Sequence, residues 1–171
     1  VWNGEGTQTW SNGIKYVGEF KNGLWNGHGE LTDSDGHSYL GGFKDGDFHG
    51  NGTYLGSDGS KTVAEYKDGK ATYVEIFFKD GSKYVGEYKE GMINGRGTFS
   101  FADGKKFVGE FKNKIPWEGE IFNNNGKLMH TVEDGKISKN IEDKDLINLA
   151  KKVSDSKTPR ELFKEVRSFA K

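Results

Sequence analysis

Aromatic, glycine and polar residues alternate in short segments along most of the chain. In residues 16–36, Tyr16, Gly18 and Phe20 occupy every second position, so a β-strand would place them on one face of a sheet. Asn22-Gly23 follows, and a second alternating segment comes after it. Two such segments joined by Asn-Gly predict a β-hairpin, because the turn needs residues that adopt positive φ.

This hairpin segment recurs along the chain, and the repeat predicts the architecture. Copies begin near residues 16, 39, 62, 84 and 107, a degenerate copy begins near residue 128, and a partial copy occupies residues 2–13. A nearly constant period of 21 to 23 residues indicates one structural unit per copy. Because a single hairpin is only marginally stable, the copies must stabilise one another as neighbours in an array.

The third and fifth copies depart from this pattern. In the third copy, Thr62 replaces the first aromatic residue, and Ala64 and Val74 replace two glycines. In the fifth copy, Lys114 replaces the glycine of the turn and Pro116 is inserted soon afterwards. The sequence thus predicts an array that weakens toward its C-terminal end.

The composition fits a thin sheet whose apolar contacts are mainly aromatic. Of the 171 residues, 32% are hydrophobic and 13% aromatic, and 26 residues are glycine. A glycine on the ring face leaves room for a neighbouring ring to lie over its backbone, which predicts stacked rings on one face. The formal net charge is -1, so no overall field favours nucleic acid as a partner.

The sequence leaves the cellular compartment open. The absence of cysteine excludes disulfides and thiolate metal sites. No apolar run approaches the roughly 20 residues that span a bilayer, so we expect a soluble protein. The chain begins at Val1 inside a repeat, which suggests that an upstream segment is missing; a cytoplasmic protein and an exported one with its leader removed are both consistent with this.

The candidate chemical groups have simpler structural interpretations. The four histidines occupy different columns of the repeat, so no register assembles them as metal ligands. Residues 33–36, Asp-Ser-Asp-Gly, resemble the start of a calcium loop, but no glutamate closes that loop, so we expect a turn. The recurring glutamates face away from the rings, and no two of them form an acid/base pair. We therefore expect no catalytic, cofactor-binding or metal-binding residues and no enzymatic activity.

The pattern changes after residue 139. Glycine disappears, and apolar residues recur at helical spacing from Ile141 to Val153 and again from Leu162 to Phe169. Thr158-Pro159 is typical of a helix start. The sequence therefore divides into a repeat array at residues 1–139 and a short pair of amphipathic helices at residues 140–171, which either cap the last repeats or reach a partner.

The repeated pattern aromatic-x-Gly-Glu-aromatic, Asn/Asp-Gly, Gly-x-Gly and Asp-Gly resembles the MORN (membrane occupation and recognition nexus) repeat family. The resemblance covers roughly residues 2–135 and is strongest at residues 16–59 and 84–111. It implies a mainly β fold, in which tandem hairpins form an elongated, single-layer, twisted antiparallel sheet of the solenoid type. The helical pair at residues 140–171 would follow this sheet.

The resemblance also implies a non-catalytic protein-interaction or scaffolding module, whose aromatic-lined groove takes a protein or peptide. The partner-binding residues expected on that groove are Tyr16, Phe20, Trp25, Tyr39, Phe43, Phe48, Tyr84, Tyr88, Phe107 and Phe111. The alternatives are a phospholipid-associating module and a regulatory fragment of a larger enzyme, and a homodimer stays open. The repeats lack the basic stripe that attracts an anionic membrane, which weakens the lipid alternative.

Overall fold

The computed structural model describes residues 1–137, which form two compact units, residues 1–72 and residues 73–137. All regular structure in this range is β-strand, and thirteen strands occur in it. This confirms the mainly β fold of antiparallel hairpins. The predicted helical pair at residues 140–171 lies outside the described residues.

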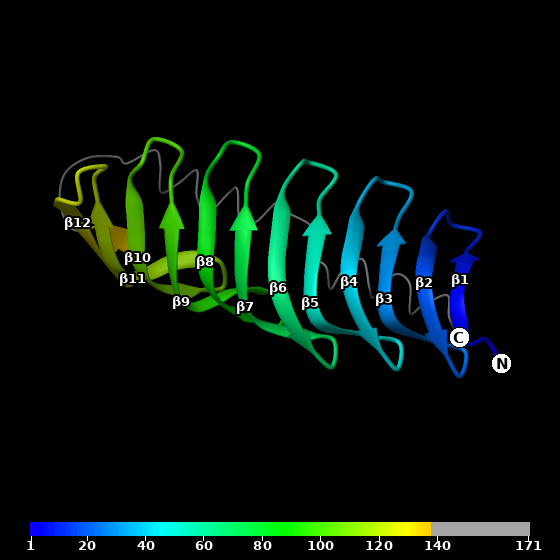
Figure 1. Cartoon of the computed structure of the whole chain (residues 1–171). Helices are drawn as coiled ribbons and strands as arrows, with labels where there is room; N and C mark the ends of the chain where they lie inside the picture. The colour runs from blue at the N-terminus through cyan, green and yellow to red at the C-terminus, as the bar shows by residue number, and fades with distance from the viewer. Residues whose placement is uncertain (138–171) are drawn as a thin grey trace. The chain divides into compact units, whose positions relative to one another are not determined.

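Each unit is a single layer of strands in which neighbours along the chain are antiparallel neighbours in the sheet (Figure 1). Unit 1 contains β1 (Gly4–Thr9), β2 (Lys15–Lys21), β3 (Leu24–Thr32), β4 (Ser38–Lys44), β5 (Asp47–Leu55) and β6 (Lys61–Lys67). Strand β7 (Lys70–Phe77) contains the boundary between the units. Unit 2 continues with β8 (Lys83–Lys89), β9 (Met92–Ser100), β10 (Lys106–Lys112), β11 (Ile115–Phe122), β12 (Leu128–Glu133) and β13 (Lys136–Ile137).

The strand register confirms which residues share a face. On β2 and β3, Tyr16 pairs with Leu31, Gly18 with Gly29, and Phe20 with Trp25. The register shifts between Gly18 and Phe20, so that residues 26–28 of β3 lie opposite a single residue of β2. The same shift recurs in the β4/β5 and β8/β9 hairpins. These bulges were not among the sequence predictions, although a glycine inside a strand can mark one; Gly27, Gly50 and Gly95 lie in the bulges, and all three have positive φ.

The glutamate opposite the bulge has a structural role. The backbone N–H of His28 donates to Oε1 of Glu19 at 2.8 Å. The carboxylate thus accepts a hydrogen bond from a backbone N–H that strand pairing does not use at the bulge. In the β4/β5 hairpin, Gly42 stands at the corresponding position, where an added Cβ would collide with the carbonyl oxygen of His49. Glu19 therefore stabilises the bulge of its own hairpin.

Two-residue turns with positive φ at both residues close the hairpins at one end of the strands. Asn22-Gly23 has φ values of 53° and 81°, and Asp45-Gly46 has 50° and 84°. This geometry belongs to type I′ turns, whose twist matches the right-handed twist of the strands. The second turn residue also donates its backbone N–H to the preceding copy, as Gly46 does to the carbonyl oxygen of Trp25 at 2.9 Å. Within each unit, these turns therefore link one copy to the copy before it.

Replacing Lys114 by glycine is expected to stabilise unit 2 by about 1 kcal/mol. Lys114 occupies the glycine position of its turn with a φ of 73°, a region that costs an L side chain roughly 1–2 kcal/mol. Glycine removes that strain and keeps the N–H that donates to the carbonyl oxygen of Ile93 at 2.9 Å. Urea unfolding measures the change, and Gly91→Lys in the preceding turn should lower stability by a similar amount. A Lys114→Gly variant no more stable than the parent would contradict the turn assignment.

Candidate partner-binding face

The rings expected to bind a partner lie on one face of each unit, which we call the ring face. In unit 1, the Tyr16 ring stacks on that of Trp25, with 4.7 Å between their centroids and 14° between their planes. Tyr39 stacks on Phe48 in the same way, at 4.0 Å and 26°. Phe43 joins these two pairs, because its centroid lies 5.1 Å from that of Tyr16 and 5.3 Å from that of Tyr39. The rings of successive copies therefore form a continuous row.

Glycine provides the surface on which the tyrosines of this row lie. The Tyr16 ring covers Gly18 and Gly29, and a Cβ on Gly29 would come within 2.5 Å of Cε2 of Tyr16. The phenol of Tyr16 then donates to the carbonyl oxygen of Glu19 at 3.0 Å. Burial, followed by the nearby charges of Glu19 and Glu5, raises the pKa of the Tyr16 phenol well above its usual range. The tyrosine ring, the glycines beneath it and the hydrogen bond of its phenol thus form one packing arrangement in this copy.

Unit 2 repeats the arrangement with fewer rings. Tyr84 covers Gly97, and its phenol donates to the carbonyl oxygen of Glu87 at 2.8 Å. The Phe111 ring meets Tyr84 and Phe107 edge to face, at 5.1 Å between centroids in both pairs. Tyr88 lies on the same face, and its phenol donates to the carbonyl oxygen of Gly91 at 2.7 Å.

The ten predicted residues are all buried. Tyr16, Tyr39, Tyr84 and Phe107 are 0% exposed, and the most exposed of the ten, Trp25, reaches only 8%. They are therefore part of the core of their units, and their role in partner binding stays a prediction. Ring-face contacts also involve Trp10 and Tyr66, which the predicted site omitted: Trp10 lies 5.6 Å from Trp25 and Tyr66 lies 5.4 Å from Phe48. The alternation along β6 could have indicated Tyr66, whereas Trp10 follows the end of β1 and has no such signal.

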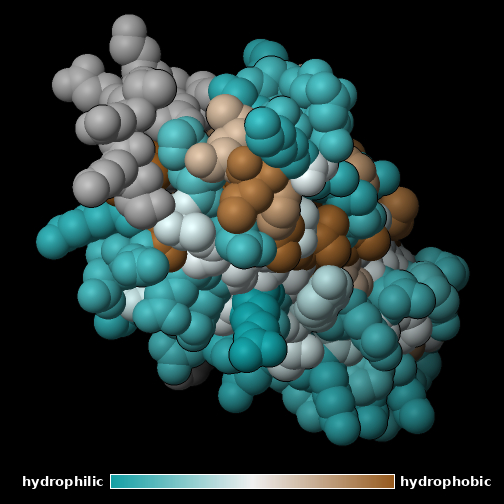
Figure 2. All heavy atoms as spheres, turned by 90° about the vertical axis from the view of Figure 1, so that its left-hand side faces the viewer, coloured by the Kyte–Doolittle hydropathy of each residue, from teal (hydrophilic) through white to brown (hydrophobic). Residues whose placement is uncertain are grey.

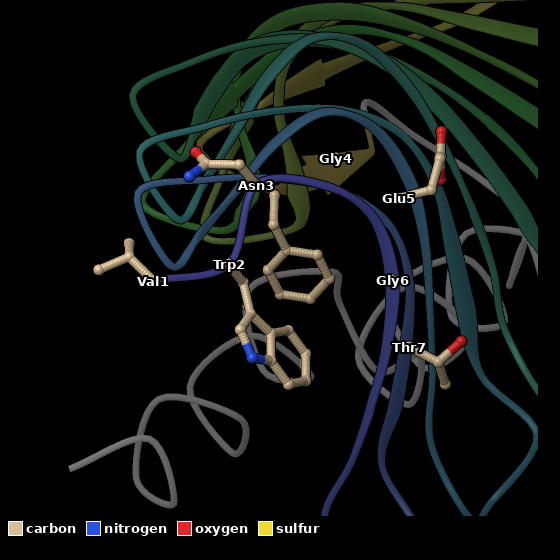
Figure 3. A pocket seen from close by; sticks show the side chains of 8 residues that line it. Val1, Trp2, Asn3, Gly4, Glu5, Gly6 and Thr7 are labelled. Atoms are coloured by element: carbon tan, nitrogen blue, oxygen red, sulfur yellow. The ribbon is translucent and has the colours of Figure 1, made fainter.

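An open recess adjoins the ring row at β1 (Figure 3). It has a volume of about 390 Å³ and is lined by residues 1–7 and Phe20. Trp2 is 55% exposed there and meets the Phe20 ring edge to face at 5.1 Å. The sequence indicated a partial copy at residues 2–13 but did not predict this recess, because Phe20, which lines it, belongs to the following copy.

The other face of each sheet is more exposed. Val17 and Leu40, which alternate with the rings of unit 1, are 39% and 62% exposed, and Val108 of unit 2 is 43% exposed. Exposed apolar residues also occur on β11 and β12 of unit 2, where Ile115, Leu128 and Met129 are 41–47% exposed. Figure 2 shows apolar surface in the middle of one side of the molecule, bordered by hydrophilic residues.

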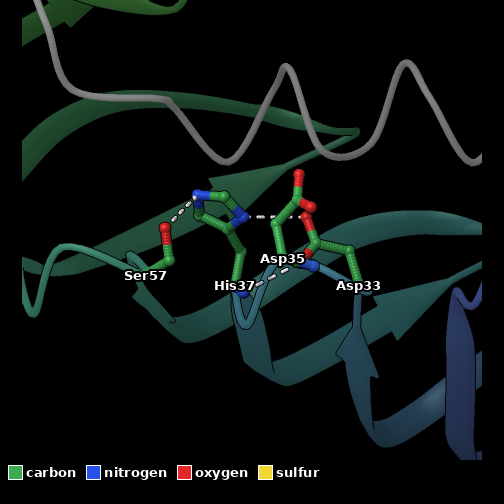
Figure 4. A network of polar contacts seen from close by, with 4 residues as sticks. All are labelled: Asp33, Asp35, His37 and Ser57. Atoms are coloured by element: carbon green, nitrogen blue, oxygen red, sulfur yellow. Dashed lines mark hydrogen bonds and ion pairs between the residues drawn. The ribbon is translucent and has the colours of Figure 1, made fainter.

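A polar network joins two successive turns of unit 1 (Figure 4). Nδ1 of His37 lies 2.8 Å from Oδ2 of Asp33, and its Nε2 lies 3.1 Å from the Ser57 hydroxyl. The other oxygen of Asp33 accepts the backbone N–H groups of Asp35 and His37, both at 2.9 Å. This confirms that residues 33–36 form a turn. His37 is only 7% exposed, so it is a buried link between turns, which its position in the repeat did not reveal.

Within residues 1–137, one group of acidic and histidine side chains has potential metal-ligand atoms within 4.8 Å of one another. It consists of Asp33, Asp35 and His37. The hydrogen bonds of Asp33 account for both of its oxygens within the turn. The order Ser57, His37, Asp33 resembles the nucleophile, base and orienting acid of some hydrolases. In this chain it links the turn at residues 33–37 to the turn at residues 56–60.

The turn at residues 56–60, which contains Ser57, also gives a pH-dependent prediction. Burial alone would raise the pKa of Asp58, but hydrogen bonds from the hydroxyl and N–H of Ser60, at 2.6 and 2.8 Å, outweigh it and hold the pKa below its usual value. A folded-state pKa below the unfolded-state value stabilises the fold above about pH 4, and the stabilisation is lost as the pH falls through the folded-state pKa.

Asp58→Asn should therefore be less stable than the parent at pH 7, by about 0.5 kcal/mol because solvent screens this exposed side chain, and the gap should narrow as the pH falls below about 4. Urea unfolding across this range measures both quantities. Ser60→Ala serves as the matched variant, since it removes the hydroxyl donor and should give a smaller gap with the same pH dependence. A gap that stays constant down to pH 2 would disprove this role of Asp58.

These features define a class of protein: a tandem hairpin array in which aromatic rings lie on paired glycines and, within a unit, turns contact the preceding copy. The MORN repeat model matches residues 1–15, 16–38, 39–61 and 84–106 of the chain. The chain is a MORN-repeat protein. The third copy, at residues 62–83, lies between the matched ranges, and it is the copy that lacks the aromatic residue and both glycines.

Two solved structures are reported as similar, both of the TCP10 domain of Danio rerio CPAP. The E1021V mutant domain shares 14% identity, with a TM-score of 0.34, over 73% of this chain and 70% of that chain. The wild-type domain, in complex with a peptide of Danio rerio STIL, shares 14% identity, with a TM-score of 0.25, over 73% and 66%. The curated proteins contain no match. Within residues 1–137, no helix has the length and apolar character needed to cross a membrane.

Proposed function

We propose that the chain is a non-catalytic protein-interaction module, and that the ring face receives an amphipathic helix or an extended peptide. The observation that carries this proposal is the continuous row of rings on one face of a single-layer sheet in unit 1. Apolar faces of this kind suit the apolar side of a helix, with aromatic side chains as anchors.

Phospholipid is the weaker candidate partner. Residues 1–72 carry six basic and ten acidic side chains, a net charge of -4, which repels an anionic membrane surface. Binding of the chain to vesicles that contain anionic lipid can be compared directly with its binding to displayed peptides. Flotation of the chain with these vesicles at low salt, together with failure to bind any displayed peptide, would favour the lipid alternative.

Selection of displayed peptides against the full chain tests the proposal. The matched variants are Trp25→Leu, on the ring face, and Leu40→Ser, on the opposite face of the neighbouring strand. Selected peptides should bind Trp25→Leu at least about tenfold more weakly than the parent and bind Leu40→Ser normally. A thermal melt confirms that each variant is folded. Peptides that bind Trp25→Leu as well as the parent would disprove the use of this face.

Hydrolysis of an activated ester tests the non-catalytic part of the proposal, because Ser57, His37 and Asp33 are aligned. We expect equal rates of p-nitrophenyl acetate hydrolysis for the parent and for Ser57→Ala. The same rate is expected for Ser34→Ala, the corresponding residue of the preceding turn. A loss of most of the activity in Ser57→Ala alone would overturn the non-catalytic assignment.

A further inference from the structure

Residues 2–9 follow the same course as β3 but have a strand on one side only. Strand β1 pairs with β2, and within residues 1–137 no strand pairs with its other edge. The sequence Trp-Asn-Gly-x-Gly occupies residues 2–6 and again residues 25–29. In both places the first glycine has positive φ, and the carbonyl oxygen of the tryptophan accepts the N–H of a turn glycine of the next copy at 2.9 Å. The free edge of β1 therefore presents the surface that β3 presents to β2.

At β3 that surface is covered by the Tyr16 ring of β2. The ring stacks on Trp25, lies over Gly29 and meets Phe43 edge to face. The three groups in the corresponding positions at the free edge all line the open recess (Figure 3): Trp2, Gly6 and Phe20. The recess is therefore the seat of one aromatic ring.

Exposure differs between the two sites as this correspondence predicts. Trp25, which lies against the Tyr16 ring, is 8% exposed, whereas Trp2 is 55% exposed. The atoms nearest to a Cβ built on Gly6 belong to Phe20 and Trp2, the two rings that border the recess. An exposed ring beside unpaired strand backbone suits strand addition, in which main-chain hydrogen bonds give affinity and side-chain pockets give specificity.

The pairing of β2 with β3 defines the side chains that an added strand needs. Tyr16 supplies the ring, Gly18 pairs with Gly29, and Phe20 pairs with Trp25. A Cβ on Gly18 would lie 2.5 Å from the Cα of Gly29, so a larger residue does not fit between the strands there. A strand that adds to β1 therefore needs an aromatic residue, a glycine two positions later and a second aromatic residue two positions after that.

One position of the added strand should differ from β2. At the bulge, Glu19 of β2 accepts the N–H of His28, whose imidazole lies 3.9 Å from the same carboxylate. Glu5 occupies the place of His28 in β1, so a glutamate on the added strand would bring two carboxylates together. Glutamine offers an oxygen acceptor without the charge. The sequence that fits is therefore aromatic-x-Gly-Gln-aromatic.

The described strands of the chain do not supply this segment. Within residues 1–137, the strands with an aromatic-x-Gly pattern are β2, β4, β8 and β10, and all four are paired on both sides. The last described strand, β13, consists of Lys136 and Ile137 and offers neither a ring nor a glycine. A second copy would have to give up pairs of its own to fill the site. A separate polypeptide carries no such cost, and β1 has neither the proline nor the lysine that protects many sheet edges.

We infer that the free edge of β1 binds an extended segment of a separate polypeptide with the sequence aromatic-x-Gly-Gln-aromatic, which adds to unit 1 as an antiparallel strand. The first ring of this segment occupies the recess, over Gly6 and against Trp2 and Phe20. The inference goes beyond the proposed function, because the site is an edge of the sheet and not its ring face.

Binding of a synthetic peptide to the full chain tests the inference. The probe is Lys-Tyr-Val-Gly-Gln-Phe-Lys with a fluorophore at its N-terminus, and fluorescence anisotropy measures its Kd. Replacing its tyrosine by serine, or its glycine by valine, should weaken binding at least about tenfold, since the first loses the ring and the second collides with β1. Equal Kd values for the probe and its valine version, or no binding of the probe at about 1 mM, would overturn the inference.

Variants of the chain locate the bound probe. Trp2→Ala should weaken binding at least about fivefold, because it removes the ring against which the tyrosine packs. Trp25→Leu on the ring face and Leu40→Ser on the opposite face should bind the probe normally, and a thermal melt confirms that each variant is folded. A loss of binding in Trp25→Leu without one in Trp2→Ala would place the probe on the ring face and overturn the inference.

Photo-cross-linking tests the register without changing the chain. Benzoylphenylalanine in place of the probe's tyrosine should cross-link to residues 1–8 or Phe20. The yield should be at least about fivefold higher than with benzoylphenylalanine in place of its valine, which points to the other face. Cross-links to unit 2 alone, or equal yields from the two positions, would contradict strand addition at β1.

Sedimentation velocity tests a second copy as the occupant. Without peptide, the chain should sediment as a monomer as its concentration rises. A dimer that forms with rising concentration, and that Trp2→Ala abolishes, would show that a second copy fills the edge and would reject the separate polypeptide.

Discussion

Replacing Gly52 by alanine is expected to destabilise unit 1 by about 3 kcal/mol. Gly52 lies beneath the Tyr39 ring, and an added Cβ would lie 2.5 Å from both Cε2 and Cζ of that ring. The ring also covers Gly41, the cross-strand partner of Gly52, since a Cβ on Gly41 would lie 2.6 Å from the Tyr39 hydroxyl oxygen. Tyr39 is 0% exposed, so its displacement disturbs Phe43 and Phe48 as well.

Gly50→Ala on the same strand is the matched control, because it separates backbone strain from the collision with the ring. Gly50 has a φ of 70°, but no heavy atom lies within 4 Å of a Cβ built there. Its replacement should therefore cost only about 1–2 kcal/mol, from the left-handed backbone. Urea unfolding at neutral pH gives both values. Equal costs at the two positions would mean that Tyr39 does not depend on the glycine beneath it.

Replacing Tyr84 by alanine is expected to destabilise unit 2 by about 4 kcal/mol, whereas phenylalanine should cost about 1 kcal/mol. The alanine variant removes the whole ring and leaves Gly86 and Gly97 uncovered. Phenylalanine keeps the ring and its edge-to-face contact with Phe111, and removes only the hydrogen bond from the phenol to the carbonyl oxygen of Glu87. The difference between the two variants isolates the contribution of the ring.

Tyr73→Ala is the control for this pair of variants. Tyr73 belongs to the same unit but is 57% exposed, so its loss should change stability by less than about 0.5 kcal/mol. Thermal and urea unfolding should rank the variants in the order Tyr73→Ala, Tyr84→Phe, Tyr84→Ala. A Tyr84→Phe variant as damaging as Tyr84→Ala would show that the hydrogen bond, and not the ring, holds the hairpin together.

The dependence of ring on glycine also explains the divergent third copy. Where the copies that begin at residues 16, 39, 84 and 107 have a tyrosine or phenylalanine over two glycines, the third copy has Thr62, Ala64 and Val74. Without a ring to accommodate, the glycines lose their steric purpose, and residues with better strand propensity can replace them. The three substitutions are therefore one change in packing, which accounts for their joint occurrence in a single copy.

The tight turns could be predicted from the sequence because their backbone requirements are local. Asn22-Gly23 and Asp45-Gly46 form the expected tight turns, because their φ requirements are visible in the residue types. Lys114 keeps the left-handed conformation although its residue type disfavours it. The neighbouring hairpins and the hydrogen bond to Ile93 determine the backbone there, so local preference is overridden by the array.

The sequence by itself determined the hairpin period, the faces of the strands and the pairing of rings with glycines, because alternation and turn chemistry act over a few residues. Only the tertiary structure decided how deeply the rings are buried, where the bulges opposite Glu19 and Glu87 lie, and that His37 reaches Ser57 in the next copy. These features depend on contacts between residues about 20 positions apart. Their geometry follows from how one hairpin packs on the next, which a pattern within a single copy does not contain.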